Sequence, residues 1–110
     1  MKKQNKYFAK RVKYDGKFFH SKKEAQKYAE LKLLERAGEI ADLRTQVRIP
    51  IEIGGQKIST YVADFQFFDC KKHEMVTVDV KGYKSGVPYD LFTLKKKLVK
   101  ALHGIEVKEI

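Results

Sequence analysis

Residues Tyr61–Phe68 (YVADFQFF) and Met75–Gly82 (MVTVDVKG) decide the fold of this chain. Both runs are short and rich in β-branched and aromatic side chains, and the turn residues Asp69–Lys72 separate them, a pattern typical of a β-hairpin. Each predicted strand carries one aspartate, Asp64 or Asp79, among apolar neighbours. We therefore expect two adjacent strands with acids embedded in an apolar sheet.

The embedded acids need compensation. Side chains alternate across a strand, so Asp79 and Lys81 are predicted on one face, with the alternating valines of the second strand on the other. A carboxylate in this setting is costly to desolvate unless a cation, a metal or hydrogen bonds compensate it. Lys81 supplies one positive charge, and a divalent metal would supply the rest. The alternative interpretation is structural, with Asp64 and Asp79 as edge-strand charges or as acids facing water at a strand end.

The composition of the 110 residues predicts a single folded domain over residues 11–110, because hydrophobic residues make up 43% of the chain. No apolar run approaches the roughly 20 residues of a membrane span, and no signal peptide is recognisable, so no membrane partner is expected. The single Cys70 excludes an internal disulfide and a zinc site built from several cysteines. Such cysteine usage fits a reducing cytoplasm.

The charge balance predicts a polyanionic partner. The chain has 24 Lys and Arg against 14 Asp and Glu, a net charge of +10. Residues 1–10 are polar and basic without any period, and we expect a flexible basic arm there. For each single lysine a solvated surface position is the alternative. The lysines that we favour for phosphate contacts are Lys22, Lys23, Lys84, Lys95 and Lys96.

Turn and cap signals precede the hairpin. Asp15-Gly16 between two β-prone runs predicts a small β-ribbon over Val12–Phe19 with a type I′ turn. Ser21-Lys-Lys-Glu24 is a capping box, which predicts a helix from there to about Ala37, ended by Gly38. An apolar stripe should bury this helix; its members are Ala25, Ala29, Leu33 and Ala37, widened by Tyr28, Leu31 and Leu34.

The rest of the chain completes a mixed sheet. Alternation from Leu43 to Ile53 predicts a strand, in which Pro50 suggests an edge or a bulge, and Gly54-Gly55 is the tight turn into the Tyr61 strand. A second helix is predicted from about Tyr89 to His103, followed by a short strand over Ile105–Ile110 parallel to the Asp79 strand. The apolar stripe of this helix is Leu91, Leu94, Leu98, Ala101 and Leu102.

Glu24 has two compatible interpretations, because a capping-box glutamate needs no further function and its spacing from Tyr28 places it at the rim of the buried face. The three histidines show no zinc spacing, and neither Ser21 nor Cys70 belongs to a recognisable nucleophilic constellation. No glycine-rich phosphate loop is present, so no small-molecule cofactor is expected.

From about Tyr14 to Ile110, the order helix, three antiparallel strands, helix and strand resembles the PD-(D/E)XK nuclease superfamily. Within it the chain is most similar to a small phage-encoded, Holliday-junction-resolvase-like family. Four segments carry the resemblance: Tyr14–Gly16 (YDG), Ser21–Ala25 (SKKEA), Tyr61–Phe65 (YVADF) and Asp79–Gly82 (DVKG). One departure is Ala63, which stands where the superfamily motif has its proline.

The resemblance implies an α/β (α+β) fold with a restriction-endonuclease-like core: an N-terminal β-ribbon, then an αβββαβ mixed sheet flanked by helices. It implies that Asp64 and Asp79 are the motif acids, that Lys81 is the motif lysine, and that Glu24 is the additional helix acid of resolvase-like branches. Carboxylates with a backbone carbonyl suit Mg²⁺, with Mn²⁺ as a possible substitute, and the expected ligands are Asp64, Asp79, the Val80 carbonyl and Glu24.

Two functions follow as expectations. The first is a Mg²⁺-dependent DNA endonuclease in phage DNA recombination or processing, in the cytoplasm of the host cell. The shortness of the chain favours branched or junction DNA as substrate and a homodimer as the active form. The second is a non-catalytic nucleic-acid-binding module that keeps the nuclease fold. A structural RNA-binding protein would leave the buried acids unexplained.

Overall fold

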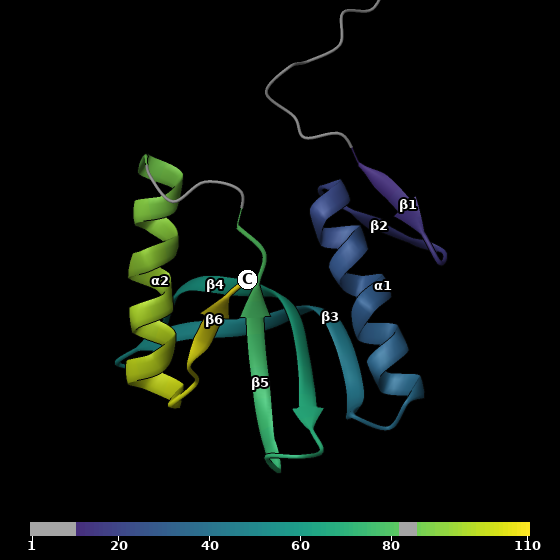
Figure 1. The fold of residues 1–110 in the computed structure, drawn as a ribbon. Helices are drawn as coiled ribbons and strands as arrows, with labels where there is room; N and C mark the ends of the chain where they lie inside the picture. Colours follow the sequence, from purple (N-terminus) through teal and green to yellow (C-terminus); the bar gives the residue numbers. More distant parts are fainter. Residues whose placement is uncertain (1–10, 82–85) are drawn as a thin grey trace, which may run out of the picture.

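A computed structural model describes residues 11–81 and 86–110 of the chain (Figure 1). The predicted order of elements is confirmed, and the protein has a mixed α+β fold. The basic arm expected over residues 1–10 and the favoured phosphate contact Lys84 lie outside the described residues. In chain order the elements are β1 (Val12–Tyr14), β2 (Lys17–Phe19), α1 (Lys22–Arg36), β3 (Ile40–Ile53), β4 (Gln56–Asp69), β5 (Glu74–Asp79), α2 (Val87–His103) and β6 (Val107–Glu109).

The main sheet has the strand order β3-β4-β5-β6, and β1 and β2 form a separate ribbon. β6 runs parallel to β5, as predicted, while the other neighbours are antiparallel. β4 carries Asp64 and β5 carries Asp79, and both are internal strands. The interpretation of these acids as edge-strand charges is therefore wrong.

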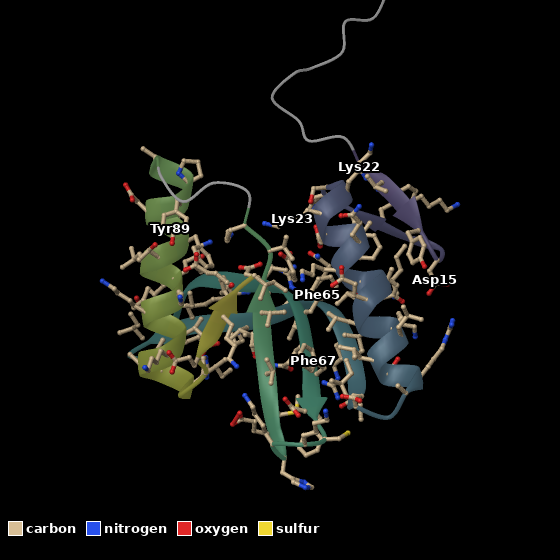
Figure 2. All side chains as sticks on the ribbon, viewed as in Figure 1. Asp15, Lys22, Lys23, Phe65, Phe67 and Tyr89 are labelled. Atoms are coloured by element: carbon tan, nitrogen blue, oxygen red, sulfur yellow. The ribbon has the colours of Figure 1, made fainter. Side chains whose placement is uncertain are left out.

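Each helix packs against a different part of the sheet, and α1 and α2 flank the strands in Figure 1. Tyr28 and Leu31 of α1 join a buried cluster with Phe65 and Phe67 of β4, which Figure 2 labels. A second buried cluster lies between α2 and the sheet, where residues of α2 pack against β3, β4 and β6. Its members are Ile49, Ile51, Tyr61, Ala63, Phe92, Val99 and Val107.

The predicted apolar stripes of both helices are partly wrong. Leu33 of α1 is 62% exposed, because the buried apolar residues of α1 are Ala25, Tyr28 and Leu31. In α2 the buried core residues are Phe92 and Val99, which the predicted stripe omits, and Leu98 of that stripe packs against the same cluster. Leu91 and Leu94 lie outside the core and are 51% and 54% exposed.

Local signals placed the turns and caps well. Asp15 and Gly16 have φ values of 55° and 75°, as a type I′ turn requires. The Ser21 hydroxyl caps α1 by accepting a hydrogen bond of 3.1 Å from the Glu24 N–H. Among the described residues no helix is long and apolar enough to cross a membrane.

Several element bounds differ from the prediction, among them those of the last strand, β6, which covers Val107–Glu109 instead of Ile105–Ile110. β3 begins at Ile40 instead of Leu43, because it pairs with β4 beyond a register shift after Ala41. β5 ends at Asp79, so Lys81 follows the strand instead of lying within it. α2 begins at Val87, because a proline in the first turn does not interrupt a helix.

Candidate active site

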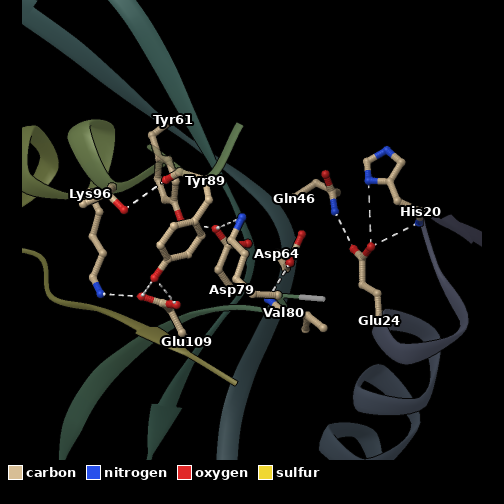
Figure 3. A network of polar contacts seen from close by, with 12 residues as sticks. His20, Glu24, Gln46, Tyr61, Asp64, Asp79, Val80, Tyr89, Lys96 and Glu109 are labelled. Atoms are coloured by element: carbon tan, nitrogen blue, oxygen red, sulfur yellow. Dashed lines mark hydrogen bonds and ion pairs between the residues drawn. The ribbon is translucent and has the colours of Figure 1, made fainter. Parts of the chain in front are cut away.

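The polar residues of the site lie in one row across the sheet. Phe65 pairs with Val78, which brings Asp64 level with Asp79 on the next strand. On the other side, the pairs Thr45–Phe65 and Val47–Ala63 place Gln46 level with Asp64. Neighbouring side chains at one level of a sheet share a face. The register therefore brings together the two predicted acids, as Figure 3 shows.

Asp79 is buried, and its carboxylate has a strong protein donor. Its Oδ2 accepts a hydrogen bond from the Tyr61 hydroxyl, which comes from β4. Burial, together with the adjacent Asp64 carboxylate, raises the pKa of Asp79 to about 7. Burial and this Asp79 contact also raise the pKa of Tyr61 well above its usual value. Tyr61 is thus a proton donor to Asp79 across the whole physiological pH range.

Asp64 is the partly exposed member of the pair. Its Oδ2 accepts a hydrogen bond of 2.8 Å from the Val80 N–H, just beyond the end of β5. Burial raises the pKa of Asp64, and its hydrogen bonds with Asp79 and the Val80 N–H work in the opposite direction. Ionising both of these adjacent carboxylates costs free energy, because their negative charges repel each other. The pair therefore favours the binding of a proton or a cation.

Lys81 provides the nearest positive charge. Its Nζ lies 3.7 Å from Asp79 Oδ2 and 3.8 Å from the centroid of the Phe92 ring of α2. A ring face attracts an ammonium group, so Phe92 helps to hold the lysine over the carboxylate. Lys23 of α1 donates a 2.7 Å hydrogen bond to the Lys81 carbonyl and so fixes the backbone of the same segment. Lys81 lies beside Asp79, as predicted, although β5 ends before it.

Glu24 is buried to 3% exposure instead of lying at the rim of the helix face. Its Oε1 accepts from the His20 N–H at 3.1 Å, one residue earlier than the helix-cap residue that a capping box normally reaches. Its Oε2 accepts from the Gln46 amide at 2.9 Å. Glu24 is therefore a cap that also reaches across to β3 (Figure 3).

Gln46 takes part because the backbone of β3 is irregular there. Its φ of 51° is left-handed, a conformation that costs a residue with a Cβ about 1–2 kcal/mol. Such strain clusters at functional sites, where the surrounding structure holds the residue in place. No sequence pattern marks a left-handed glutamine, and sequence reasoning missed this residue.

These side chains line one cleft of about 440 Å³ between the start of α1, the sheet and α2. Lys23 approaches the cleft through its bond to the Lys81 carbonyl, whereas Lys22 lies beside the ribbon (Figure 2). Lys96 is held by Glu109 at 3.1 Å, on the far side of the row. The lining includes all four predicted catalytic residues and one predicted phosphate contact: Glu24, Asp64, Asp79, Lys81 and Lys95.

The donor set suits a hard divalent cation. Asp64 and Asp79 present carboxylate oxygens side by side, and burial together with the neighbouring carboxylate raises the pKa of Asp79 although Lys81 acts in the opposite direction. Within the described part of the chain, however, no three His, Cys, Asp or Glu side chains gather into a ready metal site. A cation here would take two carboxylates and complete its shell with the Val80 carbonyl and water.

The fold and the cleft together define an α+β protein with a paired-aspartate site at the end of an internal strand. Residues 4–108 match the family model described as "Protein of unknown function (DUF1064)", and the chain belongs to this family. No curated protein and no solved structure gave a match. Family membership therefore supplies no activity.

Proposed function

We propose that this protein is a divalent-cation-dependent endonuclease that hydrolyses phosphodiester bonds in DNA, built on a restriction-endonuclease-like core. The observation that carries the proposal is the group of Asp64, Asp79 and Lys81 in one cleft, with the lysine ammonium 3.7 Å from Asp79. Two acids and a lysine at the end of a central strand pair supply the charges that phosphodiester hydrolysis needs.

Asp64, Asp79 and the Val80 carbonyl would hold the cation, Mg²⁺ by preference or Mn²⁺, and Glu24 would approach it from α1. Such a cation, when bound, activates water and neutralises negative charge that develops on the phosphate. Glu24 already accepts one hydrogen bond on each carboxylate oxygen, and the remaining lone pairs could accept a bond from a cation-bound water.

The side chains of this protein position the substrate. Lys81 is held by Asp79 and Phe92 and stabilises charge on the phosphoryl oxygens. The Tyr61 hydroxyl keeps Asp79 in one orientation. Lys95 of α2 lines the cleft, and Lys23 of α1 is bound to the carbonyl of Lys81, which also lines it. In this proposal the two lysines contact the phosphates on either side of the reacting bond. Branched or junction DNA in phage recombination or processing is the substrate class that the sequence resemblance favours.

The active form is a homodimer that pairs through the outer stripe of α2. Val87, Leu91 and Leu94 are exposed along one side of this helix, and Leu91 also lines the cleft. Exposed apolar residues that are contiguous mark interaction surfaces. In an antiparallel pair of α2 helices, Leu94 meets its own copy and Val87 meets Ala101 of the other copy. The arrangement also brings Asp90 of each copy beside Lys97 of the other. The stripe is therefore self-complementary in shape and in charge.

The second candidate is a nucleic-acid-binding module that does not cut. It is favoured by the protein donors that already satisfy the acids, namely the Val80 N–H for Asp64 and the Gln46 amide for Glu24. Such bonds can stabilise the acids without a cation. The basic surface would then bind DNA, and the polar row would only shape the cleft.

Cleavage of labelled four-way-junction, flap and linear duplex DNA in Mg²⁺, Mn²⁺ or EDTA separates the two candidates. We expect cutting that requires the cation and is lost in Asp79→Ala and Lys81→Ala while folding and DNA binding persist. Lys72→Ala, a surface lysine in the turn after β4, is the matched control and keeps full activity. Binding of every substrate without cutting, unchanged in both variants, would reject the nuclease in favour of the binding module.

A further inference from the structure

The outer face of the β1–β2 ribbon makes no contribution to the core. The register pairs Val12 with Phe19 and Lys13 with Phe18, so the two pairs point to opposite faces. On the inner face Phe19 is buried and Val12 packs against the α1 cluster. On the outer face Phe18 is 54% exposed, although a phenylalanine gains most by burial.

The ribbon is nevertheless held firmly on α1. The rings of Tyr14 and Tyr28 meet edge to face with centroids 6.1 Å apart. The Tyr28 hydroxyl also donates a 3.0 Å hydrogen bond to Asp15 Oδ2 at the tip of the ribbon. This bond turns the only acid of the ribbon toward the helix, so the outer face carries no negative charge.

Two cations lie close to the ring of Phe18. Arg11 Cζ is 4.4 Å from the centroid of its ring, and Lys13 Nζ is 5.7 Å from it. Within residues 11–81 and 86–110, no carboxylate forms an ion pair with either of them. An exposed ring flanked by free cations is the surface that single-stranded nucleic acid recognises, because bases stack on the ring and phosphates bind the cations.

The ribbon also continues into the cleft. β2 ends at Phe19, and the next two residues, His20 and Ser21, line the cleft. Figure 1 shows the ribbon beside the N-terminal end of α1, the end that carries Lys22 and Lys23. Positive side chains therefore run from the outer face of the ribbon to the wall of the cleft.

We propose that Arg11, Lys13 and Phe18 form a DNA-binding surface that holds an unpaired strand leaving the cleft, with one base stacked on Phe18. The inference rests on the proposed function and names its substrate class: DNA with unpaired bases next to the cleaved bond. The stacking surface selects such DNA over a continuous duplex, whose bases are not available for stacking.

The test is equilibrium binding in EDTA of two fluorescent DNAs of equal length, a splayed-arm DNA with unpaired strands and a duplex. Phe18→Ala should weaken binding of the splayed-arm DNA about tenfold and leave duplex binding within about twofold, since stacking needs free bases. Lys13→Ala should weaken both and lower the slope of log K against log salt by about 1. Leu33→Ala, another exposed apolar residue, and Lys72→Ala are the matched controls, and thermal unfolding checks that every variant is folded.

An equal effect of Phe18→Ala and Leu33→Ala, or the same loss for splayed-arm DNA and duplex, would overturn the inference. Binding is measured without a cation, so the result does not depend on cleavage. If the wild-type protein cuts none of the DNAs but Phe18→Ala still loses the splayed-arm DNA selectively, the proposed nuclease fails and the ribbon surface stands. If the wild-type protein cuts DNA and Phe18→Ala binds both DNAs like the wild type, the proposed nuclease stands and the ribbon surface is rejected.

Discussion

Replacing Asp79 by asparagine is expected to stabilise the folded protein at neutral pH and to abolish DNA cleavage. Burial and Asp64 raise the pKa of Asp79 from 3.8 to about 7, so the folded chain opposes its ionisation. The pKa of Asp79 is higher in the folded than in the unfolded state. The contribution of Asp79 to the free energy of unfolding is therefore fully present below about pH 4 and is lost as the pH rises through about 7. Asparagine carries no charge and still offers Tyr61 an acceptor oxygen.

The magnitude follows from the size of the shift. A difference of about three pKa units between the folded and unfolded states corresponds to about 4 kcal/mol of the free energy of unfolding at pH 8. This value is an upper bound, because the Asp79 carboxyl shares a proton with its neighbour Asp64. We expect a measured gain of about 2–4 kcal/mol in the free energy of unfolding for Asp79→Asn at pH 8, falling to near zero at pH 4.

Urea denaturation in EDTA at a series of pH values between 4 and 8.5 measures this difference. Glu30→Gln, which neutralises an exposed acid on α1, is the matched control. A variant Asp79→Asn that is less stable than the wild type at pH 8, or a difference independent of pH, would refute the reasoning. Either result would mean that Lys81 and Tyr61 already stabilise the ionised carboxylate in full.

Three further results are expected. Tyr61→Phe removes the hydroxyl that lowers the pKa of Asp79, so the pH at which cleavage reaches half its maximum should rise. A pH–rate profile in which this midpoint falls or does not change would contradict the prediction. Glu24→Gln keeps an acceptor for the His20 N–H and should reduce cleavage at unchanged Tm if Glu24 serves the cation, whereas unchanged cleavage would leave it a helix cap. Leu94→Glu should convert the dimer to a monomer in light-scattering measurements, and a wild type that is already monomeric would reject the α2 interface.

Much of the architecture could be predicted because local chemistry specifies it. The Asp15-Gly16 turn and the Ser21 cap each depend on neighbouring residues only, and both lie as predicted. Asp64 and Asp79 are predicted on adjacent strands of one hairpin, and the observed register brings them side by side. The hairpin register therefore follows from the sequence pattern and its turn.

The rest depends on tertiary packing. The helix α2 has two apolar faces, and periodicity alone cannot tell that Phe92 enters the core while Leu91 and Leu94 lie outside it. Gln46 reaches Glu24 only through a left-handed backbone, which the sequence does not signal. Tyr61 reads as an ordinary strand former, and its role as donor to Asp79 depends on the strand pairing.

The paired aspartates are tested most directly by isothermal titration of Mn²⁺ into the protein without DNA. We expect one cation per chain, lost in both Asp64→Asn and Asp79→Asn, with release of a proton at pH 6.5 that disappears at pH 8.5. The proton comes from Asp79, which is partly protonated below its pKa of about 7. Absence of binding, or equal binding by wild type and both variants, would contradict the assignment of this cleft as a cation-dependent active site.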